Sequence, residues 1–205
     1  MLRFVLALFL GLMLIDAALA DFLPVAFDAS FVQEKHSSVS KNVDTTNLDI
    51  KYEFPGNFYL KEANNNTVYV CNADKVWYYT PPFIEGEPGL LKTGESSKYC
   101  YSEIFDTLKH GLKSNKKYTV SKMVDGGYEI DFTPKSRNKL GLSKLEISFK
   151  GKKELFMHIK ELSLYYIGDK HPTKLKFKNF KVVKKFASEV FLFTPPENTE
   201  IQRMK

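Results

Sequence analysis

The sequence predicts a mainly β protein of the α+β class, built on a curved antiparallel sheet of about ten strands with one or two helices across its face. Aromatic residues make up 14% of the 205 residues, with 17 Phe and 11 Tyr, and such side chains favour strands over helices. Apolar and polar residues alternate with a period of two along much of the chain, as in strands with one buried face. One segment has the periodicity of an amphipathic helix.

The first 20 residues have the pattern of a signal peptide. Arg3 supplies a positive charge, residues 4–15 are almost continuously apolar, and Ala18 and Ala20 are the small residues that precede cleavage after Ala20. The apolar run is too short to span a bilayer. We therefore expect an exported protein in which residues 21–205 form a single domain. The alternatives are an uncleaved anchor and a first buried helix.

Alternating apolar residues predict a series of strands after the signal peptide. The expected strands cover residues 48–54, 58–60, 67–71 and 76–79. The segments between them are rich in Asn and Asp, which favours turns, so the strands form a meander of hairpins. Pro81 and Pro82 end the last strand, because proline cannot donate to a strand ladder.

The helical segment begins near residue 102. Ser102 is a candidate N-cap for a helix of three turns. Its apolar positions at helical spacing are Ile104, Phe105, Leu108 and Leu112. Residues 81–98, which precede it, contain three Pro and three Gly and favour a surface loop.

The second half of the chain again has the pattern of strands. The expected strands cover residues 118–121, 128–132, 145–149, 157–166, 175–183 and 191–193. Asp125-Gly126-Gly127 predicts a hairpin turn, because glycine adopts positive φ. Pro134 and Pro195 are expected to end strands.

Two strands change the parity of their apolar residues partway along. Met157 and Ile159 have one parity, whereas Leu162 and Leu164 have the other. A similar change follows Phe177. Either a bulge switches the faces or both faces are buried. Bulges bend a sheet towards a half-barrel, whose inner side is either a filled core or a hydrophobic pocket.

Cys71 and Cys100 are the two cysteines of the chain. An oxidising compartment permits them to pair, and closing a loop of this length would stabilise the fold by about 3 kcal/mol. Two buried free thiols are the alternative. A metal site would need more ligands nearby, and a nucleophilic thiol would need a positioned His.

The sequence has few features of an enzyme. Its four histidines are scattered without metal-ligand spacing, and no hydrolase, metalloprotease or phosphate-loop motif occurs. We therefore expect no catalytic residue, no metal and no cofactor.

The net charge is +6, and its excess is concentrated in residues 150–185. Lys174, Lys176 and Lys178 share one face of an expected strand. Such a face favours anionic lipids or acidic partners, or it is a solvated face that discourages edge aggregation. Nucleic acid is not expected as a partner, because the chain has no base-reading or stacking motif.

Four short motifs resemble the serial landmarks of the LolA family, the periplasmic carriers of outer-membrane lipoproteins. These are Phe27-Asp28-Ala29-Ser30-Phe31-Val32-Gln33, Phe54-Pro55-Gly56-Asn57-Phe58-Tyr59-Leu60, Asp74-Lys75-Val76-Trp77-Tyr78-Tyr79 and Phe191-Leu192-Phe193-Thr194-Pro195-Pro196-Glu197-Asn198-Thr199-Glu200-Ile201. Each motif is short, but their order and spacing extend across nearly the whole mature chain.

The resemblance implies an eleven-stranded incomplete β-barrel with a helical lid over its concave face. An apolar cavity there would hold the acyl chains of a lipoprotein, received from an inner-membrane ABC transporter and passed to an outer-membrane receptor, with the protein a periplasmic monomer. The residues that would bind lipid are Phe31, Phe58, Leu60, Tyr69, Trp77, Tyr79, Ile147 and Phe149. The lid residues would be Phe105, Leu108 and Leu112.

The sequence departs from the family pattern at two places. Phe54 occupies the position before the proline at which the family usually has an Arg that latches the lid. Residues 21–26 are too few for the N-terminal helix that the family lays against the sheet. These departures keep open two alternatives, which are a carrier or sensor of another lipid and a secreted β domain that carries nothing.

Overall fold

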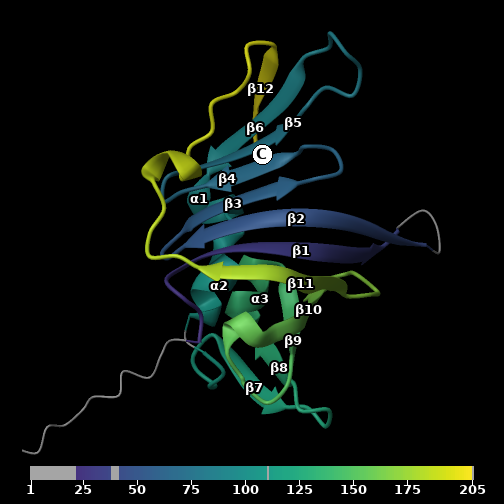
Figure 1. Cartoon of the computed structure of the whole chain (residues 1–205), viewed down its shortest axis with the longest axis vertical. Helices are drawn as coiled ribbons and strands as arrows, with labels where there is room; N and C mark the ends of the chain where they lie inside the picture. Colours follow the sequence, from purple (N-terminus) through teal and green to yellow (C-terminus); the bar gives the residue numbers. More distant parts are fainter. Residues whose placement is uncertain (1–21, 38–41, 110, 205) are drawn as a thin grey trace, which may run out of the picture.

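The computed structural model describes residues 22–37, 42–109 and 111–204, so the expected signal peptide and His110 lie outside the described residues. The described residues form one sheet of 12 strands (Figure 1). Its first six strands are β1 (Ala26–His36), β2 (Val43–Glu53), β3 (Asn57–Glu62), β4 (Val68–Cys71), β5 (Lys75–Thr80) and β6 (Gly89–Glu95). The others are β7 (Tyr118–Lys122), β8 (Tyr128–Phe132), β9 (Leu142–Phe149), β10 (Ile159–Tyr166), β11 (Thr173–Val182) and β12 (Thr199–Arg203).

The sheet is open, with β12 and β7 at its two edges. The strand order is β12-β6-β5-β4-β3-β2-β1-β11-β10-β9-β8-β7. Neighbouring strands are antiparallel except for β12, which pairs parallel to β6. The predicted fold class, a mainly β curved sheet that does not close into a barrel, is confirmed, with 12 strands in place of the ten or eleven expected.

Both changes of parity in the sequence correspond to irregularities in the strand register. Between β1 and β11, the register shifts so that Ser30 pairs with Asn179 while Phe31 pairs with Phe177. Between β9 and β10, the register shifts between Ile159 and Glu161. Each bulge moves the following apolar side chains to the other parity while they stay on the same face of the sheet.

Three α-helices lie on one face of the sheet, which we call the inner face (Figure 1). They are α1 (Ser96–Tyr99), α2 (Ser102–Leu108) and α3 (Pro134–Leu140). Two short 3₁₀ helices, η1 (Phe156–His158) and η2 (Ser188–Phe191), complete the elements of the described residues.

The helix expected from residue 102 is shorter than predicted. It ends at Leu108, and Gly111 follows with φ 77°, so Leu112 lies outside the helix. Ser102 is the first helical residue and not the cap, because the N-cap is Tyr101 and makes no side-chain cap hydrogen bond. The apolar spacing of Leu112 therefore continued a pattern that the backbone does not follow.

Helix α3 was not predicted. Thr133-Pro134 was interpreted as a strand end, but Pro134 also starts a helix, because its missing N–H would be unpaired in the first turn. Gly141 ends α3 in the left-handed conformation, with φ 66°.

The expected surface loop at residues 81–98 is wrong in its second half, which forms β6 and α1. Two glycines occur in β6 because aromatic rings lie directly above them. A Cβ added at Gly89 would come within 2.5 Å of the Tyr79 hydroxyl oxygen, and one at Gly94 within 2.9 Å of the Tyr99 ring. The glycines that suggested a loop are thus packing sites.

The last predicted strand, residues 191–193, is also wrong. Phe191 ends η2, and the final strand is β12. The segment around η2 packs against the outer face of the sheet, where Phe193 lies 5.2 Å from the Tyr79 ring and the Asn72 side chain donates to the Phe191 carbonyl. Its apolar residues are therefore used for covering the sheet and not for strand pairing.

The lysines of β11 lie on the outer face. Lys174 forms an ion pair with Glu161 at 3.3 Å, and Lys176 pairs with Glu34. Lys178 donates to the Asn47 side chain at 2.9 Å. The basic face is thus partly neutralised by its strand neighbours.

An aromatic cluster fills one part of the inner side. Phe27 lies 5.3 Å from Tyr52, 5.5 Å from Phe105, 5.3 Å from Phe156 and 5.1 Å from Phe180, between ring centroids. All of these rings except that of Phe180 are buried. This cluster joins α2 and η1 to the sheet. Among the described residues, no helix has the length and apolarity needed to cross a membrane.

Candidate functional site

Beside the aromatic cluster, the inner side is not filled. A cavity of about 550 Å³ lies between the sheet and α2. Its lining residues come from the inner face and from the lid: Gln33, Lys35, Leu48, Ile50, Phe58, Leu60, Glu62, Tyr69, Tyr78, Tyr101, Ile104, Phe105, Leu108, Leu145, Leu162, Leu164, Tyr166, Asp169, Thr173 and Leu175. The inner side therefore combines the two alternatives left open by the sequence, a packed core and a pocket.

The period of the strands explains how so many apolar side chains reach one cavity. Leu48 and Ile50 in β2, and Leu162 and Leu164 in β10, are each two residues apart and so share a face. In β2 the intervening Asp49 lies on the outer face, where it accepts a hydrogen bond from Ser30. The order of strands then places β10, β11, β1 and β2 side by side, which makes the wall continuous.

The polar groups of the cavity are few and are of two kinds. Phenol hydroxyls belong to Tyr69, Tyr78, Tyr101 and Tyr166. Charged and amide groups lie at strand ends, on Gln33, Lys35, Glu62 and Asp169. No group of three or more metal-ligating side chains occurs among the residues that the structure describes. The arrangement suits a ligand whose larger part is hydrocarbon.

Helix α2 forms the lid of the cavity through Phe105 and Leu108. The ring of Phe105 lies 5.7 Å from that of Phe58 and 5.2 Å from that of Tyr52. Leu108 is fully buried. One face of the lid therefore belongs to the aromatic cluster and to the cavity at the same time.

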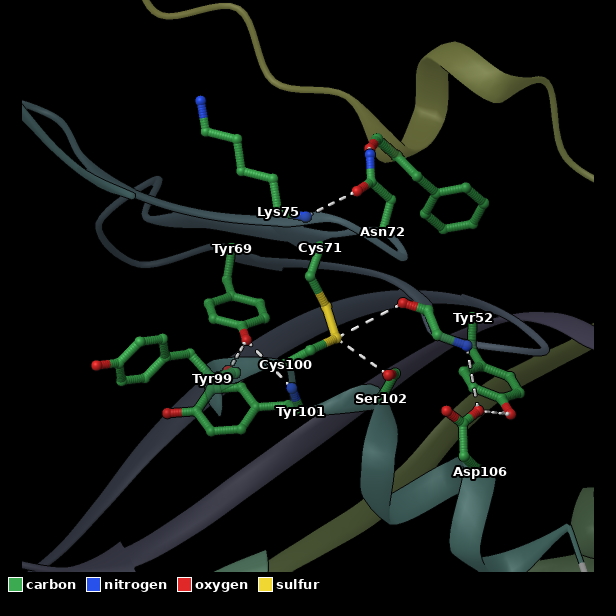
Figure 2. Close-up of a disulfide and its surroundings, with 12 residues drawn as sticks. Tyr52, Tyr69, Cys71, Asn72, Lys75, Tyr99, Cys100, Tyr101, Ser102 and Asp106 are labelled. Atoms are coloured by element: carbon green, nitrogen blue, oxygen red, sulfur yellow. Dashed lines mark hydrogen bonds between the residues drawn. A yellow bond between two sulfur atoms is a disulfide. The ribbon is translucent and has the colours of Figure 1, made fainter. Parts of the chain in front are cut away.

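A disulfide joins the start of the lid to the sheet. Cys100 precedes α2, and it is bonded to Cys71 at the end of β4 (Figure 2). Next to it, the Tyr69 hydroxyl donates to the Tyr99 carbonyl and accepts from the Tyr101 backbone N–H, with a distance of 3.1 Å for the second bond. The N-terminal end of the lid is thus fixed by one covalent bond and two hydrogen bonds.

The middle of the lid is attached through the carboxylate of Asp106. Its Oδ1 accepts from the Tyr52 hydroxyl at 2.7 Å and from the Gly56 backbone N–H at 3.3 Å (Figure 2). Burial raises the pKa of Asp106 above its ordinary value, and the two hydrogen bonds oppose this shift. Burial and the bond to Asp106 also raise the pKa of Tyr52.

The latch position of the family is replaced by a different contact. Phe54, which is 38% exposed, lies with its ring centroid 5.7 Å from Lys109 Nζ at the end of α2. Lys109 also donates to the Leu23 carbonyl at 3.1 Å. The charged group is therefore on the lid, and the sheet side supplies an aromatic ring and a backbone carbonyl.

Asparagine at position 106 is expected to keep the lid attached, whereas alanine is not. Asn retains a carbonyl oxygen for Tyr52 and Gly56, but Asp106→Ala leaves both donors without it and should lower the free energy of unfolding by about 1–3 kcal/mol. Because the folded protein holds the Asp106 proton more tightly than the unfolded chain, this group stabilises the fold most at low pH. That stabilisation is lost as the pH rises through the raised pKa.

Denaturant unfolding of the wild type and of Asp106→Asn over a pH series measures this effect. The stability of the wild type relative to the Asn variant should increase as the pH falls from neutral. The same substitution at the exposed Asp74 is the control. A wild type that instead loses stability relative to Asp106→Asn on acidification would contradict the role of burial.

The structure separates the candidate site residues into four groups. Phe58, Leu60 and Tyr69 line the cavity wall, and Phe105 and Leu108 line the lid. Phe31 and Ile147 are on the inner side but belong to the packed core, being 1% and 0% exposed. Phe149 and Leu112 are partly buried residues at the margin of that core. None of these last four lines the cavity.

Trp77 and Tyr79 are corrections to the expected lipid-binding set. Tyr78 lines the cavity, so its two neighbours in β5 point to the outer face. There the Tyr79 ring packs on Phe193, and Lys75 Nζ lies 5.4 Å from the Trp77 ring. Four consecutive apolar residues at 76–79 carry no alternation that would assign a face.

Sequence reasoning missed most of the wall from β2, β10 and β11. Leu48, Ile50, Leu162, Leu164 and Leu175 do alternate with polar residues, and this pattern correctly indicated a buried face. It did not indicate which buried residues face a void, because that depends on how much of the inner side the lid and the aromatic cluster fill.

An open sheet with a helical lid over an apolar cavity defines the class of half-barrels that can enclose an apolar ligand. Residues 25–194 match the family model described as outer membrane lipoprotein carrier protein LolA. Because this match covers most of the chain, the protein belongs to the LolA family.

Solved structures with a similar arrangement have low sequence identity to this chain. An uncharacterized conserved protein from Thermus thermophilus is 11% identical, with 89% of this chain and 93% of that chain covered and a TM-score of 0.49. A LolA superfamily protein from Nitrosomonas europaea is 6% identical, with 82% and 90% covered and a TM-score of 0.46. A DUF1329 family protein from Desulfovibrio piger is 13% identical, with 82% and 89% covered and a TM-score of 0.43. No curated protein sequence matches significantly.

Proposed function

We propose that this protein carries lipoproteins from the inner to the outer membrane by holding their acyl chains in the cavity under α2. The observation that carries the proposal is the apolar cavity of about 550 Å³ on the inner face of a LolA-family sheet. Its size lies within the range of about 300–1,000 Å³ typical of ligand pockets. Each buried methylene contributes about 0.8 kcal/mol, so one acyl chain would gain substantial affinity without any ionic contact.

Release of the cargo would be favoured by the lid itself. Phe105 packs against the aromatic cluster when the lid is closed, and it also lines the cavity. Closing the emptied carrier therefore recovers apolar contacts that a bulky cargo would keep apart. No nucleotide, metal or catalytic residue is required for this cycle, and we propose that the protein is not an enzyme.

The partners and location follow from the same proposal. Members of the LolA family are periplasmic carriers of lipoproteins. We propose export with cleavage after Ala20, loading by an inner-membrane ABC transporter, and delivery by a monomer to an outer-membrane receptor. The Cys71–Cys100 disulfide supports a final location in an oxidising compartment.

Cells that depend on this protein test the proposal directly. Depletion should leave lipoproteins in the inner membrane, and a plasmid-borne copy should restore their sorting. Leu164→Trp, which would occupy the cavity, should fail to restore it, whereas the adjacent Tyr165→Trp on the outer face should succeed. Ordinary sorting after depletion would contradict the carrier role, and a co-purified lipid that is not part of a lipoprotein would favour the carrier or sensor of another lipid.

A further inference from the structure

Three phenol hydroxyls in the cavity have no partner in the protein. Tyr78, Tyr101 and Tyr166 all line the cavity, and their hydroxyls form no hydrogen bond with any other residue that the structure describes. The fourth phenol, that of Tyr69, is fully used by the lid backbone. A phenol in an apolar pocket usually has a hydrogen-bond partner, because leaving it unpaired is unfavourable.

The three phenols come from three different elements and lie close to one another. Tyr101 precedes α2 and stacks on Tyr69 with ring centroids 4.6 Å apart, and Tyr69 lies 6.4 Å from Tyr78 in β5. Tyr166 ends β10 on the opposite wall of the cavity. The lid thus presents one phenol between two that belong to the sheet.

Two of these phenols are held in the protonated, hydrogen-bond-donating form by their surroundings. Burial, followed by the neighbouring Tyr78, raises the pKa of Tyr101. Burial, followed by Tyr101 and Asp169, raises the pKa of Tyr166 to about 12. Tyr101 thus lies within electrostatic range of both other phenols. A ligand group that satisfies all three should therefore be a hydrogen-bond acceptor.

The charges around the cavity favour a neutral acceptor over an anionic one. Among the lining residues, Lys35 is the cation, and Glu62 and Asp169 are both acidic. Asp169 also contributes to the raised pKa of Tyr166, so it is near the phenols. A free carboxylate or a phosphate would be repelled there, whereas the carbonyl oxygen of an ester or an amide would not.

We propose that Tyr78, Tyr101 and Tyr166 form a subsite that hydrogen-bonds the ester or amide carbonyl oxygen at the head of an acyl chain held in the cavity. The subsite rests on the proposed function, because it assumes that an acyl chain occupies this cavity. It adds a requirement that the apolar wall alone does not impose: the ligand is an acyl ester or amide, and not merely a hydrocarbon of suitable length.

Two lipids that differ only in the carbonyl group test the subsite. Monolauroylglycerol carries an ester carbonyl, and 1-O-dodecylglycerol has the same chain and glycerol head joined by an ether. Calorimetric titration of the full mature protein below the critical micelle concentration should give about five- to tenfold tighter binding of the ester. The combined variant Tyr78→Phe, Tyr101→Phe and Tyr166→Phe should bind both lipids with the affinity that the wild type has for the ether.

A control variant and the possible outcomes separate this subsite from the carrier role. Tyr59→Phe removes a phenol from the outer face and should leave the preference for the ester intact. Equal binding of ester and ether by the wild type, or an unchanged preference in the triple variant, would overturn the subsite while the cavity still binds chains. Failure of the wild type to bind either lipid would overturn the proposed function together with the subsite.

Discussion

Phe105→Ala is expected to lower the free energy of unfolding by about 3–5 kcal/mol, the range measured when large buried aromatic side chains are truncated. The Phe105 ring is buried, and its centroid lies within 6.4 Å of the ring centroids of Phe27, Tyr52, Phe58 and Phe156. Its removal leaves a void between the lid and the sheet, which the surrounding rings cannot fill completely. Denaturant unfolding monitored by circular dichroism measures the loss.

Phe83→Ala is a matched control, because it deletes the same atoms from a side chain that is 99% exposed. That variant should change the stability by less than about 0.5 kcal/mol. If Phe105→Ala costs no more than the control, the lid is not packed on the sheet as described. The same void should also slow cargo release, because closing the lid then recovers fewer apolar contacts.

The second large effect is expected from the disulfide. Cys71 and Cys100 are 29 residues apart in the sequence, and a crosslink of that span should stabilise the folded protein by about 3 kcal/mol. The double variant Cys71→Ser, Cys100→Ser should lose this stability and should also release the N-terminal end of the lid. Hydrogen exchange of the α2 amides should therefore accelerate more than exchange in the central strands β1 and β2.

Reduction provides the control for this prediction. Dithiothreitol should bring the wild type to the stability of the double variant and should have no effect on the variant itself. If α2 exchanges equally fast with and without the crosslink, the hydrogen bonds of Tyr69 and Asp106 hold the lid without help from the disulfide.

The alternating pattern of the sequence predicted most of the strands, and the two changes of parity predicted both bulges. These features depend on local periodicity and on which residues avoid water. The errors occurred where a residue has its role through a distant neighbour. Gly89 and Gly94 are in a strand because the Tyr79 and Tyr99 rings cover them, and no local pattern signals such a contact.

The candidate site was predictable to a similar extent. Phe58 and Leu60 could be placed on the cavity wall by resemblance, and Phe105 on the lid by helical spacing. The attachment of the lid through Asp106 could not be predicted, because it joins residues 50 or more positions apart. Nor could the contact of Lys109 with Phe54, which takes the place of the family's arginine latch and depends on where α2 ends.

The claim that an acyl chain enters the space between α2 and the inner face can be tested by photo-crosslinking. A fatty acyl probe with a diazirine near the middle of its chain should, after irradiation and peptide mass spectrometry, label cavity residues such as Leu48, Ile50, Leu162 and Leu164. Labelling should fall when unlabelled lipid competes. Labels confined to outer-face or loop residues, or the absence of saturable labelling, would contradict the claim.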